Sequence, residues 1–351
     1  MAVTTVLARK FRPKNFAELV GQEHVVRALS NALETKRLHH AYLFTGTRGV
    51  GKTTIARIMA KALNCETGIT PSPCGKCSAC TEIDTGRFVD LLEVDAATNT
   101  KVEEMRELLD KAQYMPVSGR FKVYIIDEVH MLSKSAFNSM LKTLEEPPEH
   151  VKFILATTDP QKVPVTVLSR CLQFNLKQMP PTLIAEHLQV VLKAENIPFE
   201  IPALHMLGQA AQGSMRDSLS LHDQAIAFGG NKITTAQVSD MLGTVDQGHL
   251  FNLLDQLAAN DGQSMLAEAE QMAARSFSFE AALQDIAAIL HRIALLQTVP
   301  GSAEASQPMY DRLEKLAQLF SADDVQLYYQ IALNGRRDLA LAPDEFAGFS
   351  M

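Results

Sequence analysis

The sequence predicts an α/β fold followed by an all-α region, and three observations lead to this fold class. Short β-branched and apolar runs in the first half of the chain indicate strands. They lie at residues 41–46, 88–96, 122–128 and 152–158. Between these runs, apolar residues such as Phe137, Leu141 and Leu144 follow helical spacing. After Pro180 almost no strand-like run occurs, and only amphipathic helical periodicity continues.

Strands that alternate with helices indicate βαβ units around a parallel sheet that is buried on both faces. One helix of this part is expected to end at Pro147-Pro148, because proline lacks a backbone donor and restricts the residue before it. Gly243 marks a seam within the helical region. We therefore predict an α/β core at 1–178, a small helical domain at 179–242 and a second helical domain at 243–351.

Composition excludes several classes of protein. The 351 residues are 46% apolar and 21% charged, so the chain can bury a sizeable core. The net charge of −7 argues by itself against a protein that coats nucleic acid or an anionic membrane. However, residues 1–60 hold ten Lys and Arg against three Asp and Glu, and the remaining residues hold 23 against 37. Anion binding is therefore expected first in the N-terminal part.

The cellular compartment is predicted from what the sequence does not contain. A basic cluster follows a short apolar stretch at the N-terminus, which is the opposite order to a secretory signal. The most apolar later segment, AALQDIAAILHRIALL, is interrupted by charged residues too early for a spanning helix. We expect a soluble, cytosolic protein without membrane contact, in which the five cysteines do not form a disulfide framework.

A phosphate-binding motif follows the first predicted strand. The string GTRGVGKT fits G-x-x-x-x-G-K-[ST], and the helical pattern TIARIMAKAL follows. Its glycines let backbone N–H groups and the helix N-terminus face phosphate oxygens. Lys52 is expected to contact the β- and γ-phosphates, and the Thr53 hydroxyl to ligate Mg²⁺. The alternative is a glycine-rich turn that merely enters a helix. The predicted nucleotide-binding residues are Gly46, Thr47, Arg48, Gly49, Val50, Gly51, Lys52, Thr53 and Thr54.

The strand at 122–128 ends in the acidic pair Asp127-Glu128. Parallel sheets bind ligands at their carboxyl edge, so Asp127 is expected to hold Mg²⁺ and Glu128 to polarise the attacking water. The alternative is a solvated acidic pair at a strand end. The string DEVH also fits the D-E-x-H pattern of a class of helicases. We expect His130 to pack or to form a hydrogen bond rather than to bind a metal.

Four cysteines, Cys65, Cys74, Cys77 and Cys80, lie within sixteen residues. Thiolates at this density suit a tetrahedral Zn²⁺ site that is structural, because four ligands leave no open position. An Fe–S cluster takes the same ligands and is the alternative. Cys171 lies outside the group and is expected to be a small buried hydrophobic residue.

These motifs together resemble the gamma/tau subunit family of bacterial DNA polymerase III. The resemblance rests on the phosphate loop, DEVH, MLKTLEEPPEHVKFILATTD and VPVTVLSRCLQF. It extends from LARKFRP near residue 7 to QLYYQIALNGRRDL near residue 338. The family is the AAA+ ATPase motor of the sliding-clamp loader. The resemblance implies an AAA+ P-loop NTPase core with a zinc module at about 64–81, a helical lid domain and a C-terminal helical collar domain for oligomerisation.

The resemblance also assigns roles to single residues. Thr158 matches the first sensor of the γ-phosphate, and Arg216 matches the second sensor, which is carried on the lid. Arg170 in the string SRC matches the arginine finger, which acts in trans on a neighbouring subunit's nucleotide. Without the family, Arg170 and Arg216 are better explained as members of surface salt bridges. The residues that match the segment framing the adenine base are Arg12, Pro13, Val20 and Gly21.

The function implied is ATP hydrolysis within the DNA polymerase III holoenzyme, without a polymerase active site in this chain. ATP/ADP, Mg²⁺ and Zn²⁺ are the expected cofactors. The implied partners are the delta and delta-prime subunits, further gamma/tau copies, the beta sliding clamp and primer-template DNA, in the bacterial cytoplasm at the replisome. Lys101 and Lys134 are candidate DNA contacts, with a solvated surface lysine as the alternative for each. Two other functions remain open: a helicase or branch-migration motor, and a nucleotide-binding scaffold that does not hydrolyse.

Overall fold

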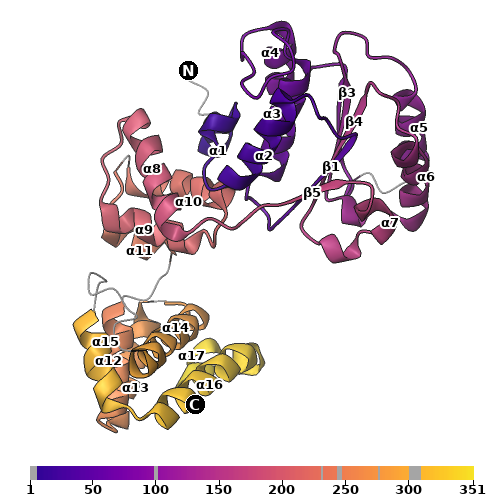
Figure 1. Ribbon diagram of the computed structural model, residues 1–351. Coiled ribbons are helices and arrows are strands. Elements are labelled where there is room, and N and C mark those ends of the chain that lie inside the picture. Colours follow the sequence, from indigo (N-terminus) through magenta and orange to yellow (C-terminus); the bar gives the residue numbers. More distant parts are fainter. Residues whose placement is uncertain (1–5, 99–101, 231, 243–246, 276, 300–309) are drawn as a thin grey trace. The chain divides into compact units, whose positions relative to one another are not determined.

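The computed structural model describes residues 6–98, 102–230, 232–242, 247–275, 277–299 and 310–351 (Figure 1). The chain divides into two compact units, Met1–Ile233 and Thr234–Met351. The first unit combines a sheet with helices, and the second consists of helices. This arrangement confirms the predicted fold class.

A five-stranded sheet with strand order β2-β3-β4-β1-β5 organises the first unit. All neighbouring strands are parallel. The strands are β1 (Ala41–Thr45), β2 (Leu91–Asp95), β3 (Lys122–Asp127), β4 (Val151–Thr157) and β5 (Leu172–Asn175). Strand β5 is absent from the predicted strands, because its four residues LQFN lie mostly exposed at the sheet edge and form no apolar run.

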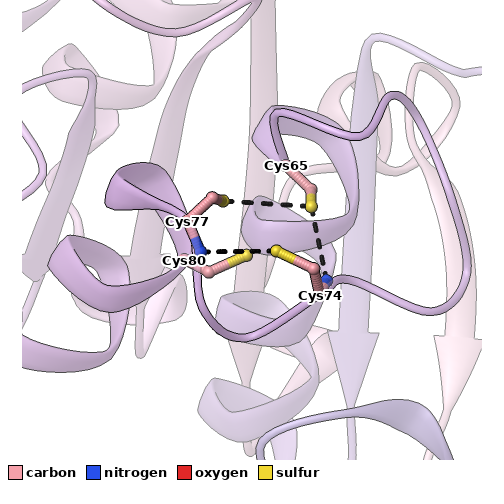
Figure 2. Close-up of side chains that lie close together, drawn as sticks. All are labelled: Cys65, Cys74, Cys77 and Cys80. Carbon is pink, nitrogen blue, oxygen red and sulfur yellow. Dashed lines mark hydrogen bonds between the residues drawn. The ribbon is translucent and has the colours of Figure 1, made fainter.

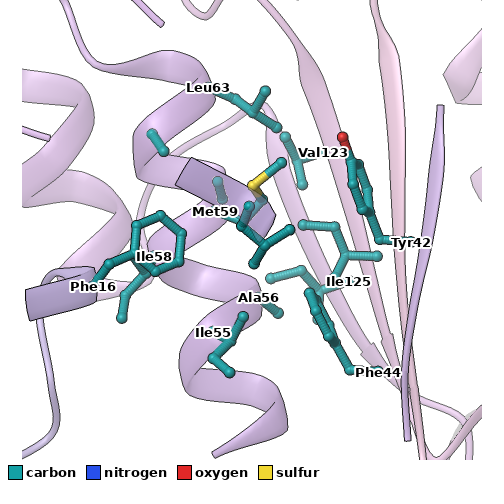
Figure 3. Packing of buried hydrophobic residues seen from close by; sticks show 14 of the residues in the cluster. Phe16, Tyr42, Phe44, Ile55, Ala56, Ile58, Met59, Leu63, Val123 and Ile125 are labelled. Carbon is teal, nitrogen blue, oxygen red and sulfur yellow. The ribbon is translucent and has the colours of Figure 1, made fainter. Parts of the chain in front are cut away.

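Helices cover both faces of the sheet (Figure 1). On one face lie α2 (Glu23–Glu34), α3 (Lys52–Asn64) and α4 (Ser78–Thr85). On the other lie α5 (Val102–Ala112), α6 (Lys134–Glu145) and α7 (Val165–Leu168). Because side chains alternate along a strand, Tyr42 and Phe44 of β1 pack in the core against α3, as Figure 3 shows. Leu43, between them, joins the core on the α6 side.

Three longer helices follow the sheet within the first unit. They are α8 (Pro181–Glu195), α9 (Ile201–Ala210) and α10 (Met215–Gly229). The short N-terminal helix α1 (Leu7–Lys10) packs on them: the Leu7 amide donates to Asp223, and Lys10 pairs with Glu195. A 3₁₀ turn, η1 (Phe16–Glu18), then leads into α2. The N-terminus therefore connects the helical segment after residue 180 to the sheet.

The second unit has its own apolar core, which includes Phe251, Leu290 and Leu316. Its helices are α11 (Thr235–Leu242), α12 (Gln247–Ala258), α13 (Gly262–Ala274), α14 (Phe279–Thr298), α15 (Tyr310–Leu319), α16 (Ala322–Asp338) and α17 (Glu345–Ser350). Across the residues that the structure describes, none of the helices is long and apolar enough to cross a membrane.

Candidate nucleotide and metal sites

The phosphate-binding motif forms the turn between β1 and α3, at the carboxyl edge of the sheet. Gly51 is the residue before α3 and has a φ of +109°, in the left-handed region. Because glycine has no side chain, Gly51 does not cap the first N–H groups of the helix. Apart from Gly51 itself and its neighbours along the chain, no described residue has an atom within 4 Å of where a Cβ at Gly51 would stand. The loop therefore presents backbone donors beside open space, which fits the binding of phosphate oxygens.

Lys52 is buried under this loop. Its Nζ donates to the carbonyl oxygens of Gly46 at 2.7 Å and Thr47 at 2.9 Å. Burial lowers the pKa of Lys52, and the nearby carboxylates of Glu128 and Asp127 partly oppose this shift. A cation with little contact to water is thus held among the phosphate-loop residues.

The two predicted magnesium ligands lie in contact. The Thr53 hydroxyl donates to Asp127 Oδ2 at 2.8 Å, and Asp127 Oδ1 accepts from the Glu128 amide at 3.0 Å. Hydroxyl and carboxylate oxygens are hard donors of the kind that Mg²⁺ prefers. The residues present therefore fit this ion.

Glu128 has a strained backbone, with φ of +47° in the left-handed region. Its Oε2 accepts from the Thr158 amide at 3.2 Å and from the Thr158 hydroxyl at 2.9 Å. His130 Nδ1 lies 3.3 Å from the same oxygen and 2.9 Å from the Thr157 hydroxyl. These contacts fix one carboxylate oxygen of Glu128, and they place His130 in the hydrogen-bonding role expected for it.

Two arginines approach the motif from other parts of the chain. The Arg216 amide, in the first turn of α10, donates to the Gly49 carbonyl at 3.4 Å. A Cβ at Gly49 would stand 1.9 Å from the Ser214 hydroxyl, so the helix can approach this closely only because residue 49 is glycine. Arg12 Nε donates to the Thr54 hydroxyl at 3.2 Å. The pKa of Arg12 is lowered by burial first and then by the charge of Arg57.

The other predicted adenine-framing residues lie on the same N-terminal segment. Pro13 and Val20 are half-buried, and Gly21 approaches Met179. Gln22, next in the chain, is a structural residue that sequence reasoning missed. It is fully buried, and its side-chain amide donates to the Lys177 carbonyl at 2.8 Å and contacts the Val50 carbonyl at 3.5 Å. No sequence pattern marks one glutamine before a helix as buried.

Arg170 lies beside the amino ends of the strands, whereas the phosphate loop lies at their carboxyl ends. Strand β5 runs parallel to β1 with Leu172 beside Tyr42, so Arg170 precedes the amino end of the sheet. Its guanidinium donates to Glu145 Oε1 and to the Thr166 carbonyl, each at 2.6 Å. The phosphate loop follows the carboxyl end of β1, so the two sites lie about a strand length apart, roughly 15 Å. The chain therefore does not bring Arg170 to its own phosphate loop.

The four cysteines converge as expected (Figure 2). Their sulfur atoms all lie within 4.8 Å of one another, and the sulfurs of Cys65 and Cys77 are 4.0 Å apart. Tetrahedral Zn–S bonds of about 2.3 Å require sulfur separations of roughly 3.8 Å, so the cluster fits zinc. Burial opposes ionisation of Cys65, but hydrogen bonds from Cys74 and Thr67 outweigh it and lower the pKa of Cys65 to about 6. Burial instead raises the pKa of Cys80, so the distances between the sulfurs, rather than the ionisation of the thiols, carry the fit to zinc.

Comparison with known proteins decides the family. "DNA polymerase III subunit gamma" of Buchnera aphidicola subsp. Baizongia pistaciae is 45% identical, over 99% of this chain and 95% of its own length. The chain belongs to the DNA polymerase III gamma/tau subunit family. This membership confirms the resemblance seen in the sequence motifs.

Three family models match successive parts of this gamma/tau family member. "DNA polymerase III, delta subunit" matches residues 21–180, and "DNA polymerase III clamp loader subunit, ATPase lid domain" matches residues 183–231. "DNA polymerase III subunits gamma and tau domain III" matches residues 233–351.

Some gamma/tau relatives are much longer. "DNA polymerase III subunit tau" of Escherichia coli (strain K12) is 55% identical over 99% of this chain, but only 54% of its own length is covered. The match in Salmonella typhimurium, also a tau subunit, is 54% identical and likewise covered over 54% of its length. The chain thus spans about half the length of these curated relatives.

A solved structure shares the fold of this gamma/tau family member. The Thermotoga maritima RuvB Holliday junction branch migration motor superposes with a TM-score of 0.52 at 22% identity. The superposition covers 70% of this chain and 79% of RuvB. At this identity the likeness concerns the fold.

The described structure thus brings most of the predicted catalytic residues, and the predicted magnesium ligand Thr53, together at the carboxyl ends of the strands. Lys52, Thr53, Asp127, Glu128 and Thr158 form this group. Arg12 and Arg216 adjoin it, whereas Arg170 does not. Of the candidate DNA contacts, Lys134 is exposed at the start of α6, and Lys101 lies outside the described residues.

Proposed function

We propose that this chain is the ATPase motor subunit of a DNA polymerase III clamp loader. In this role it binds and hydrolyses ATP to open the beta sliding clamp and to load it onto primed DNA. One observation carries the proposal: the ATP-handling residues gather at the carboxyl edge of the sheet, whereas Arg170 lies at the amino edge. Such a chain needs a neighbour's arginine to complete its site, so its hydrolysis depends on assembly.

The residues of one chain divide the work as follows. The phosphate loop binds the phosphates through backbone N–H groups, and Lys52 adds a positive charge. Thr53 and Asp127 would hold Mg²⁺, which neutralises phosphate charge when bound. Glu128, fixed through one oxygen by Thr158, orients the attacking water with the other.

Two arginines, Arg216 and Arg170, complete the proposed ATP site. Arg216 closes over the phosphates from the lid helix α10, whose first turn already contacts Gly49. Arg170 of a neighbouring copy stabilises the charge that develops on the transferred phosphoryl group.

The domain division and the partners are part of the proposal. The core spans 1–178, the lid 179–242 and the oligomerisation collar 243–351. Delta, delta-prime and further gamma/tau copies join this chain, which acts in the bacterial cytoplasm. The four cysteines bind a structural Zn²⁺ that pins the segment between α3 and β2.

Hydrolysis by the assembled complex tests the proposal. Arg170→Ala should leave ATP binding intact but lower turnover in the complex by about 10³–10⁵-fold, measured with clamp and primed DNA present. Arg87→Ala, at an exposed arginine between α4 and β2, is the matched control and should turn over normally. Normal turnover by Arg170→Ala would contradict the assignment in trans.

The same preparation separates the alternatives. ATP-dependent unwinding of forked DNA would favour the helicase or branch-migration motor. The RuvB branch migration motor has a similar fold to this chain. Turnover that stays at background with clamp, partner subunits and primed DNA present would favour the scaffold.

A further inference from the structure

The side chain of Arg170 is held in a defined position by its own chain. Its Nη2 donates to Glu145 Oε1 at 2.6 Å, and its Nη1 donates to the Thr166 carbonyl at 2.6 Å and to the Ser169 hydroxyl at 3.5 Å. A guanidinium carries five N–H donors. Among the described residues, these contacts therefore leave the Nε–H and one Nη2–H for an anion outside the chain. Arg170 is anchored and still has donors to offer.

Three elements meet at this pair. Glu145 is the last residue of α6, and the prolines that follow it at 147–148 prevent the helix from continuing. Arg170 lies between α7 and β5. His40, just before β1, places its ring against backbone groups of Arg170 and Leu144. Its Nε2 is buried without a well-formed hydrogen bond, and burial lowers its pKa. One histidine ring thus contacts the backbone at Arg170 and at the residue before Glu145.

We propose that Glu145 is a positioning residue that presents Arg170 to the nucleotide of a neighbouring copy. This inference rests on the proposed action of Arg170 in trans. An exposed ion pair contributes little to stability, so folding gives little reason for this one. A free arginine side chain, however, loses much rotamer freedom when it reaches for a phosphate. Glu145 restricts that freedom before assembly, so less is lost when the neighbour binds.

Turnover by the assembled complex with clamp and primed DNA tests the proposal. Glu145→Gln should lower kcat by roughly tenfold and leave the KM for ATP unchanged, since the anchor affects the transition state. Glu146→Gln is the matched control, because Glu146 is the next residue and is also exposed. It should keep the full kcat. Thermal unfolding of both variants checks that the fold is intact.

A double variant separates positioning from a structural effect. If Glu145 acts through Arg170, then Glu145→Gln should lower turnover no further in an Arg170→Ala background. An equal loss in both backgrounds would overturn the proposal. So would an increase in kcat, because it would mean that the pair restrains Arg170 from the neighbour's nucleotide.

The outcomes also distinguish this inference from the proposed function. If Arg170→Ala loses turnover while Glu145→Gln keeps it, only the positioning role is wrong. If Arg170→Ala itself turns over normally, the action in trans fails, and the role of Glu145 fails with it.

Discussion

The cysteine cluster and the phosphate site are built in opposite ways. The cluster comes from sixteen consecutive residues. The phosphate site instead joins the loop after β1 to the ends of β3 and β4, with the lid helix α10 and Arg12 beside it. A site that several elements assemble can respond when one of them moves, and a local site cannot. The difference separates a structural centre from one suited to a motor.

The two sites also differ in what they leave unbonded. Four thiolates would fill every coordination position of one tetrahedral metal ion and leave no position for a substrate. At the phosphate site, the contacts of Thr158 and His130 converge on a single oxygen of Glu128, and the helix start after Gly51 faces open space. The phosphate site thus differs from the cysteine cluster because some of its polar atoms can still bond a ligand, and not because of its burial or charge. Three substitutions test this distinction.

Of the three substitutions, Lys52→Ala should produce the largest change, and it should affect ATP binding and hydrolysis rather than stability. Removing a buried, charge-assisted contact costs about 2–5 kcal/mol of binding free energy, or roughly 30- to several-thousand-fold in Kd for ATP. Hydrolysis should fall to background. Titration with a fluorescent ATP analogue and steady-state turnover measure the two effects.

Zinc content and thermal unfolding should change little in Lys52→Ala, because the hydrogen bonds that its Nζ makes within the described residues stay inside the phosphate loop, at the carbonyls of Gly46 and Thr47. Lys193→Ala, at an exposed lysine of α8, is the control for loss of positive charge. A Lys52→Ala protein that loses its zinc would show that the two sites are not independent.

Sites that are local in the sequence could be predicted from it more fully than contacts that several elements assemble. The cysteine cluster and the phosphate loop were predictable because their residues are close in sequence and each type has one evident chemistry. Strands β3 and β4 were predictable because they are buried on both faces. Strand β5 was not, since its residues LQFN lack an apolar run.

Contacts that depend on register were beyond the sequence. The parallel pairing of Leu172 with Tyr42 puts Arg170 at the amino edge, and no local pattern encodes that pairing. The bond between Arg170 and Glu145 joins residues that α6 and β5 place together only after folding. Family resemblance assigns Arg170 its proposed role, and the fold adds that Arg170 lies away from the phosphate loop of its own chain.

Cys74→Ser should have the next largest effect, and on stability rather than on the phosphate site. Loss of one ligand should release the zinc that we propose this cluster binds, and the binding free energy of a structural zinc is also folding free energy. We expect a loss of about 4 kcal/mol or more, which lowers Tm by roughly 8 °C or more. Metal analysis and calorimetry measure these two changes.

Cys171→Ser is the matched control, because burial raises the pKa of Cys171 to about 12 and it lies outside the cluster. This variant should keep its zinc. If Cys74→Ser retained zinc and Tm, the four sulfurs would not form the structural centre described here.

Asp90→Asn should have the smallest effect and tests the distinction most sharply, because a buried carboxylate resembles a catalytic group. Burial alone would raise the pKa of Asp90, but N–H bonds from Gly119, Ser118 and Val117 lower it below its ordinary 3.8. Its oxygens already have backbone partners, so we assign it a structural role. Losing these charge-assisted bonds should cost about 1.5–3 kcal/mol at pH 7 and leave ATP turnover unchanged.

The pH dependence has a definite sign. Since the native pKa of Asp90 lies below that of the unfolded chain, its stabilisation is complete above pH 3.8 and is lost as pH falls through the native pKa. Urea unfolding at pH 7 and below pH 4 should therefore show the gap between wild type and Asp90→Asn narrowing in acid. Asp110→Asn, at an exposed carboxylate on α5, should show no such gap. A gap that stays constant, or a fall in turnover, would mean that saturated bonding does not separate structural carboxylates from catalytic ones in this chain.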